Sequence, residues 1–242
     1  MTNSATSPPD KDQTPVTNTS RDRINNALVE IAIITVSIVL AFALERWWDA
    51  IVDSRLKDEL VVSLIQEFEA TGVELRSALQ DHRDRMISAS SLSELDEDSI
   101  GSIDPSKISE YWYGTVTPDE TYPPTGALLS AINDNRLTLL GNSQLRSSLA
   151  SWTYQLDDLR QTERVLANYT LQTFWPSVAT DVVIPLNKET IGRETDSVVL
   201  LPATKNHLNL LSVGSSVAIN QIVGLQEKLE EILRLLREEL DG

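Results

Sequence analysis

His82 lies between Asp81 and Asp84 in a run with helical periodicity, and it is the clearest candidate for acid–base chemistry in this sequence. A carboxylate that fixes the orientation of an imidazole can make it a general base. Adjacent residues on a helix point about 100° apart, so Asp81 is poorly placed to orient His82. We therefore interpret these residues as a solvated polar face and predict that the protein is not an enzyme.

Metal and cofactor sites are not predicted either. The acidic segment 89–104 faintly resembles a calcium-binding loop, but Ile100 stands at the fifth position and Lys107 replaces the closing glutamate. The chain has no cysteine and only two histidines, which excludes disulfides and thiolate ligands and disfavours a multi-histidine site. No glycine-rich phosphate loop or nucleophile elbow occurs. We expect no cofactor.

The charge balance also limits the partners. The 242 residues include 36 acidic and 20 basic side chains, giving a net charge of −16. Nucleic-acid binding requires positive charge that displaces counterions from phosphate, so we expect no nucleic-acid partner. The negative charge falls almost entirely after residue 48: residues 1–48 hold five acidic and four basic side chains, and residues 49–242 hold the remaining 31 and 16.

The segment 27–44 is apolar and long enough to cross a bilayer. Only one of its eighteen residues, Glu30, is charged, and eighteen helical residues rise about 27 Å, close to the hydrocarbon thickness of about 30 Å. Trp47 and Trp48 follow, where an aromatic belt meets the lipid headgroups. We predict a disordered tail over 1–24, a transmembrane helix over 25–48 and an extramembrane bundle over 49–242. The predicted membrane-anchor residues are Ile31, Ile34, Ile38, Leu40, Phe42, Trp47 and Trp48.

Two other interpretations of this segment compete with a membrane span. A buried helix of a soluble protein normally keeps a polar stripe, but residues 31–44 offer only Thr35 and Ser37. A cleaved signal peptide is suggested by the Ala-Phe-Ala sequence at 41–43, but the preceding polar segment is long for one. We favour a retained anchor, and we interpret Glu30 as a polar contact at the membrane edge or with a partner helix.

Membrane orientation is only weakly encoded. Basic residues are equally numerous before and after the span, but Arg21 and Arg23 lie close to its start, whereas only Arg46 lies as close to its end. The positive-inside rule therefore favours a cytoplasmic tail and an extracytoplasmic body. The expected location is the bacterial inner membrane, crossed once.

Beyond the span, apolar residues at three- and four-residue steps predict long helices. One continues the membrane helix to about Ser88, and another runs from Asn142 or Ser143 to Trp175-Pro176. Shorter helices are predicted from Asp104-Pro105 to Tyr113 and from a Thr125 cap to about Asp134, both at the end of the bundle distal to the membrane. Residues 177–204 are either a small hairpin or a long loop. The fold class is thus all-α: a transmembrane helix continuing into an elongated up-down bundle of three long and two short helices.

The last helix, with Asn206 as its expected cap, carries the most regular pattern. Its apolar residues advance by 4, 3, 4, 3 and 4, the spacing of a coiled-coil seam flanked by charged residues. An internal bundle helix shows the same pattern, so both interpretations stay open. The predicted seam consists of Ala218, Ile222, Leu225, Leu229, Ile232 and Leu236.

Two stretches together resemble a known family. The first is Val29-Glu30-Ile31 leading an apolar span that ends at Trp48; the second is Leu137, Leu140 and Asn142 followed by the Leu-Arg-Ser-Ser-Leu sequence at 145–149. Both are similar to an uncharacterised family of small bacterial single-pass membrane proteins with a glutamate-containing span followed by tryptophan. Val29 replaces the glycine usual there, and Asp49 and Asp53 stand where that family is richer in basic residues. The resemblance implies topology, not an activity.

The sequence is compatible with two functions. The first is a membrane-anchored helical protein that works by self-association or by holding a protein partner, with the lipid bilayer as its other contact. The alternative is an extracytoplasmic bundle that senses a small ligand and signals through a partner, because the cytoplasmic tail is short.

Overall fold

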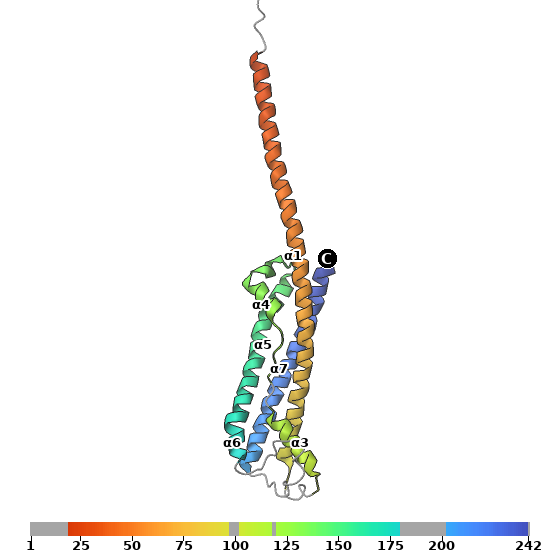
Figure 1. The fold of residues 1–242 in the computed structure, drawn as a ribbon, viewed down its shortest axis with the longest axis vertical. Helices are drawn as coiled ribbons and strands as arrows, with labels where there is room; N and C mark the ends of the chain where they lie inside the picture. Colours follow the sequence, from red (N-terminus) through yellow and green to blue (C-terminus); the bar gives the residue numbers. More distant parts are fainter. Residues whose placement is uncertain (1–18, 97–101, 118–119, 180–201, 242) are drawn as a thin grey trace, which may run out of the picture. The chain divides into compact units, whose positions relative to one another are not determined.

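The computed structural model describes residues 19–96, 102–117, 120–179 and 202–241, which contain helices and no strand, so the all-α prediction is confirmed (Figure 1). The elements are α1 (Thr19–Glu94), α3 (Pro105–Val116), α4 (Gly126–Asn133), η1 (Arg136–Leu139), α5 (Ser143–Tyr169), the π-helical turn η2 (Thr170–Phe174), α6 (Trp175–Val178) and α7 (Pro202–Asp241). The predicted hairpin segments at 182–184 and 198–200 lie outside the described residues.

The chain divides into two compact units, Met1–Asp53 and Ser54–Gly242. Helix α1 belongs to both, because it is continuous from Thr19 to Glu94. The prediction of a disordered tail over 1–24 was wrong for residues 19–24, which are helical, and its remainder, residues 1–18, lies outside the described residues. The end of α1 lies beyond the predicted Ser88. The extension to Glu94 follows from burial, since Ala89 and Leu92 are fully enclosed in the core.

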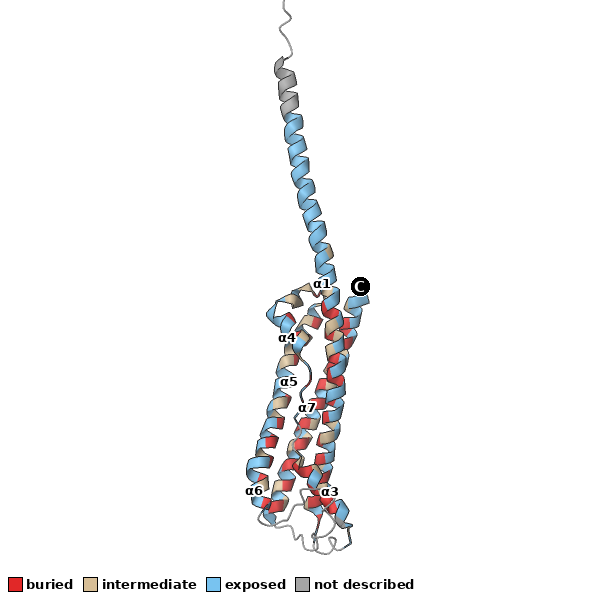
Figure 2. Ribbon diagram, in the orientation of Figure 1, coloured by how far each residue is buried: buried red, intermediate tan, exposed pale blue. Residues whose placement is uncertain are grey.

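In the second unit, α1, α5 and α7 lie side by side (Figures 1 and 2). Phe68 of α1 contacts Trp152 of α5, with ring centroids 5.1 Å apart, and later in both helices His82 meets Glu163. Helices α1 and α5 therefore run in the same direction. Helix α7 runs opposite to both, because its late residue Glu239 lies 3.9 Å from Lys57. This differs from strict up-down order.

The connection between α3 and α5 explains this topology. Near one end of the bundle, Gly114 of α3 approaches Ser88 so closely that an added Cβ would lie 2.5 Å from its hydroxyl. Near the other end, Glu67 of α1 accepts hydrogen bonds from the amides of Ala127 and Leu128 in α4, at 2.5 and 3.0 Å. The prediction that both short helices lie at the distal end was therefore wrong. The proline-rich connection returns the chain along the bundle.

Helix starts show which capping signals act as expected. The Asp104 carboxylate accepts from the Ser106 amide at 2.9 Å, and Asn142 accepts from the amides of Gln144 and Leu145 at 2.9 and 3.2 Å. Thr125 precedes α4 as predicted but makes no side-chain cap, since Glu67 takes that role. Hydrogen bonds from Ser106 hold the pKa of Asp104 below its usual range.

Two predicted helix boundaries were wrong. Asn206 is not a cap, because α7 already begins at Pro202, a residue well suited to a helix start. Trp175-Pro176 does not end the second long helix, because the chain stays helical through η2 and α6 to Val178. A π-helical turn shifts the hydrogen-bond register just before Pro176, which lacks an amide hydrogen.

Candidate membrane anchor and buried polar layer

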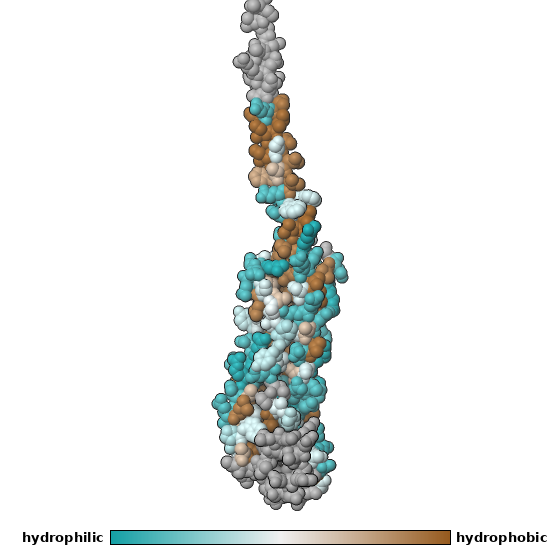
Figure 3. All heavy atoms as spheres, viewed as in Figure 1, coloured by the Kyte–Doolittle hydropathy of each residue, from teal (hydrophilic) through white to brown (hydrophobic). Residues whose placement is uncertain are grey.

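The apolar segment of α1 is exposed along its whole length. An 18-residue window in this helix has a mean hydropathy of 2.3, and none of that window is buried. The seven predicted anchor residues are between 51% and 70% exposed, and brown apolar atoms cover this stretch in Figure 3. A surface of this kind is costly in water and suited to lipid.

The polar side chains within this segment do not make it less suited to lipid. The hydroxyls of Thr35 and Ser37 donate to the carbonyls of Ile31 and Ile33, four residues earlier, both at 2.8 Å. Such bonds satisfy a hydroxyl inside a lipid-facing helix. Glu30 is exposed near the beginning of the described apolar surface.

A second helix, α7, is also long and apolar enough to cross a membrane, with a mean hydropathy of 1.4 in its best window. One third of that window is buried inside the protein. The six residues of the predicted seam all lie in the core with side chains of α1 and α5, which is the arrangement of an internal bundle helix: Ala218, Ile222, Leu225, Leu229, Ile232 and Leu236. Whether any part of α7 forms a coiled coil between chains stays a prediction.

The bundle has two apolar core clusters. The larger extends on α1 from Leu60 to Ala78 and includes Leu159 of α5. The smaller begins on α1 at Ala89 and includes Phe174 and Leu211. Buried polar side chains lie in the sequence intervals between them. We call these residues the polar layer: His82, Arg85, Thr121, Glu163, Thr170 and Ser215.

The centre of the polar layer is a His–Glu–Thr network. Nε2 of His82 lies 3.2 Å from Oε1 of Glu163. Glu163 also accepts from the Thr121 hydroxyl at 2.5 Å and from the Thr121 amide at 2.9 Å. His82 is 1% exposed and Glu163 is 2% exposed. The network therefore joins α1, α5 and the α3–α4 connection without contact with bulk water.

Opposing effects act on the carboxyl of Glu163. Burial is the largest single influence and would raise its pKa. The hydrogen bonds from His82 and Thr121, together with the charge of His82, outweigh burial and hold the pKa of Glu163 below its usual value. The carboxylate is therefore ionised at neutral pH and acts as the acceptor for its neighbours.

The interpretation of His82 as part of a solvated face was wrong. Its face of α1 is enclosed because α5 and the returning connection pack against it, and Arg85 one turn later donates to the Thr117 carbonyl. The sequence carried one usable signal. His82 lies seven residues after Leu75 and three after Leu79, which places it on the apolar stripe. Its partner Glu163 continues the α5 seam four residues after Leu159.

A second polar contact lies beyond the layer. The Tyr169 hydroxyl and Nδ1 of His207 are 2.5 Å apart, and burial raises the pKa of Tyr169. This pair joins α5 to α7 near the smaller core cluster, where Phe174 also faces His207.

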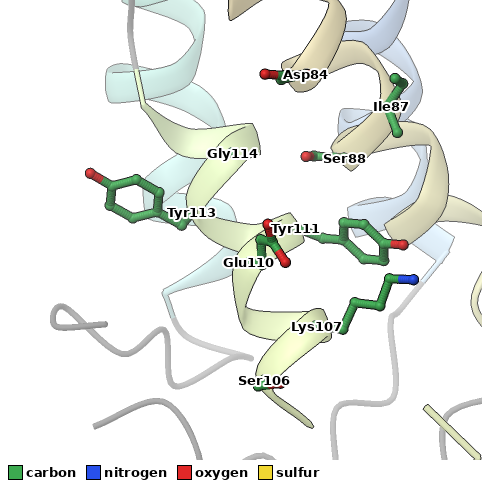
Figure 4. Close-up of a pocket in the computed structure, with 9 residues that line it drawn as sticks. All are labelled: Asp84, Ile87, Ser88, Ser106, Lys107, Glu110, Tyr111, Tyr113 and Gly114. Carbon is green, nitrogen blue, oxygen red and sulfur yellow. The ribbon is translucent and has the colours of Figure 1, made fainter. Parts of the chain in front are cut away.

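A hollow of about 740 Å³ lies between α1 and α3. Figure 4 shows Asp84 and Ser88 on α1, with Lys107, Glu110 and Tyr111 on α3. Lys107 lies 5.9 Å from the centre of the Tyr111 ring. Side chains of both charge signs thus surround a partly open space.

Neither the polar layer nor the hollow between α1 and α3 has a recognisable catalytic or metal-binding pattern. Within 19–96, 102–117, 120–179 and 202–241, no group of three His, Asp or Glu residues could hold a metal ion. Comparison with family models, with curated proteins and with solved structures finds no match to this chain. The resemblance to single-pass bacterial membrane proteins stays a prediction.

Proposed function

We propose that this chain is a single-pass membrane protein whose helical bundle acts by self-association or by holding a protein partner. The observation that carries the proposal is the exposed apolar segment of α1. Its side chains are apolar around the whole helix, so burial against the chain's own bundle could cover only one side of them. A bilayer covers all sides at once.

Helix α7 is assigned to the bundle and not to a second span. Its most apolar positions already contact α1 and α5, and withdrawing them would open both core clusters. Its charged final turns, which include Glu227, Glu231 and Arg234, would also be costly in hydrocarbon. Of the two helices that are long and apolar enough to cross a membrane, we therefore propose that only α1 crosses it and that α7 belongs to the bundle.

The proposed orientation has the short tail in the cytoplasm and the bundle outside the bacterial inner membrane, following Arg21 and Arg23. With 31 acidic and 16 basic residues after residue 48, the bundle is repelled by anionic lipid headgroups. The bundle therefore stands away from the lipid surface, where other proteins can contact it.

The role we propose is non-catalytic, and the surroundings of His82, the best acid–base candidate, support it. His82 and Glu163 are enclosed, and each serves the other as a hydrogen-bond partner. A general base must reach the proton that it abstracts, and a substrate has no access to this network. We assign the network to joining three elements of the bundle, and no cofactor is needed for that role.

The proposal is tested by protease accessibility on intact and lysed cells, combined with native mass measurement of the detergent-solubilised full chain. A bundle digested once the outer membrane is opened, and a mass of two or more copies or of a defined complex, are expected. A protected bundle would refute the orientation. A strictly monomeric chain without a co-purifying partner would refute the mode of action.

Ligand sensing is the second candidate, and the hollow between α1 and α3 favours it. Asp84, Ser88, Lys107 and Glu110 give it polar groups of both signs, and one wall is the same helix that contains the apolar span. Trp112, buried on α3, is a convenient reporter. Tryptophan fluorescence that changes with a panel of zwitterionic metabolites would support this candidate, and an unchanged spectrum in the wild type and in Glu110→Gln would argue against it.

A further inference from the structure

Helix α7 carries a second seam on the side opposite its core. Its positions advance by 4, 3, 4, 3 and 4, as in the buried seam, but they are offset by about half a turn, and all six are exposed. We call this the outer seam: Asn206, Leu210, Val213, Val217, Asn220 and Gly224.

The outer seam lies in a long uncharged stretch. No Asp, Glu, Lys or Arg occurs between Lys205 and Glu227, although charged residues make up 23% of the chain. Leu210 and Val213 are 57% and 62% exposed. After Gly224, the same face of α7 becomes charged. A solvent-facing helix surface of this length normally carries charge, so this face is suited to contact with another surface.

The heptad positions indicate what kind of surface that is. Taking Leu210 as position a places Val217 at a as well, and Asn206, Val213 and Asn220 at d. Apolar residues at a and d form a coiled-coil seam, and a polar residue in the seam needs a hydrogen-bond partner on the facing helix. An identical helix supplies such partners, because in parallel alignment Asn206 and Asn220 each face the same asparagine of the second copy.

We infer that the outer seam of α7 packs against the outer seam of a second copy of this chain, as a parallel two-stranded contact. This inference rests on the proposed membrane anchoring and names the interface for self-association. Copies tethered to one side of a membrane meet in the same orientation and at high effective concentration, so a short seam suffices.

The charge distribution selects a second copy over other occupants. Two chains of charge −16 repel over most of their surfaces and can approach only where charge is absent. A basic protein partner would instead be drawn to the acidic surfaces. A membrane surface with anionic headgroups is repelled by the net negative charge of the bundle.

Single-cysteine crosslinking in membranes tests the inference with the full chain. Because the protein has no cysteine, Val213→Cys and Val217→Cys each introduce a unique thiol. Val73→Cys on α1 is the matched control, since Val73 is 57% exposed. A short bis-maleimide is expected to yield covalent dimers at 213 and 217 and about tenfold less at 73. Val217→Lys in the Val213→Cys background is expected to reduce crosslinking at least about tenfold, because like charges would face each other.

The possible failures are distinguishable. If native mass measurement finds dimers but crosslinks form at 73 and not at 213 or 217, self-association stands and this interface is overturned. If the wild-type chain is monomeric, the proposed self-association itself fails. Adducts of another mass at 217 would replace the second copy by a different protein. Protection of that thiol from a membrane-impermeant reagent without any dimer would indicate lipid contact, which also overturns the inference.

Discussion

Two parts of the same helix, α1, differ in how their apolar side chains are arranged and covered. From Leu28 to Trp48, apolar side chains surround the helix and are exposed. From Leu60 to Leu92, they form one stripe and are buried against α5, α7 and the short helices. Leu40 is 70% exposed and Leu64 is fully buried, although both are leucines in one continuous helix. The distribution of apolar residues around a helix, more than their number, decides whether lipid or protein covers it.

The polar layer adds a second contrast within the bundle. The core clusters on either side need only shape and apolar surface, whereas His82 and Glu163 need particular hydrogen-bond partners. Buried polar networks are costly when broken, because the remaining partner keeps its desolvation cost.

Breaking the polar layer is expected to have the largest effect. Glu163→Ala leaves His82 and the Thr121 amide without their acceptor in a closed interior, which should lower the free energy of unfolding by about 3–5 kcal/mol. Denaturant unfolding of the detergent-solubilised chain measures it. The control is Glu110→Ala, a carboxylate at the open hollow. Equal stability of the two variants would contradict the role given to the layer.

The two leucines of α1 provide the next test. Leu64→Ala removes a fully buried side chain and should cost about 2–5 kcal/mol in the same unfolding measurement. Leu40→Ala should leave bundle unfolding unchanged, because no part of the described structure packs against Leu40. A comparable loss at both positions would mean that the segment before Trp48 is covered by protein.

Acidification is expected to weaken the polar layer and to leave the apolar core clusters unaffected. The pKa of Glu163 is lower in the folded protein than its usual value, so the ionised carboxylate contributes stability that is complete above the unfolded-state pKa. That contribution should disappear as the pH falls through the folded-state pKa, with a slope of at most about 1.4 kcal/mol per pH unit. Glu163→Gln should remove this part of the pH dependence. Unchanged pH profiles of thermal unfolding would refute this.

The helix caps give the smallest expected difference. Asn142→Ala removes two cap hydrogen bonds from α5 and should cost about 1 kcal/mol. Thr125→Ala should be close to neutral, because the amides of α4 are capped by Glu67. Thermal unfolding of both variants against the wild type measures this, and a larger loss for Thr125→Ala would contradict the cap assignment.

Local signals predicted much of this fold. Proline at a helix start, Asp104 and Asn142 as caps, and three- and four-residue spacing all act within one or two turns, so the sequence around them is sufficient. The α7 seam was found for the same reason, but its two interpretations could not be separated without the positions of α1 and α5.

Features that depend on distant segments were missed. Glu67, Glu163 and Glu239 are ordinary helical carboxylates in the sequence, but each binds amides or a histidine more than 40 residues away. The direction of α5 was also missed, because a connection of extended residues can either reverse the chain or carry it along the bundle. His82 was misjudged since its neighbours Asp81 and Asp84 suggested solvent, while its register on the stripe indicated burial.

The central claim is that the exposed segment of α1 is held in lipid. Extraction of cell membranes with alkaline carbonate, followed by high-speed sedimentation and detection of the unprocessed full-length chain, tests it most directly. We predict that the wild-type protein stays in the membrane pellet and is released only by detergent, whereas a double substitution, Ile34→Arg with Ile38→Arg, moves it to the supernatant. Full-length wild-type protein in the supernatant without detergent would contradict the account.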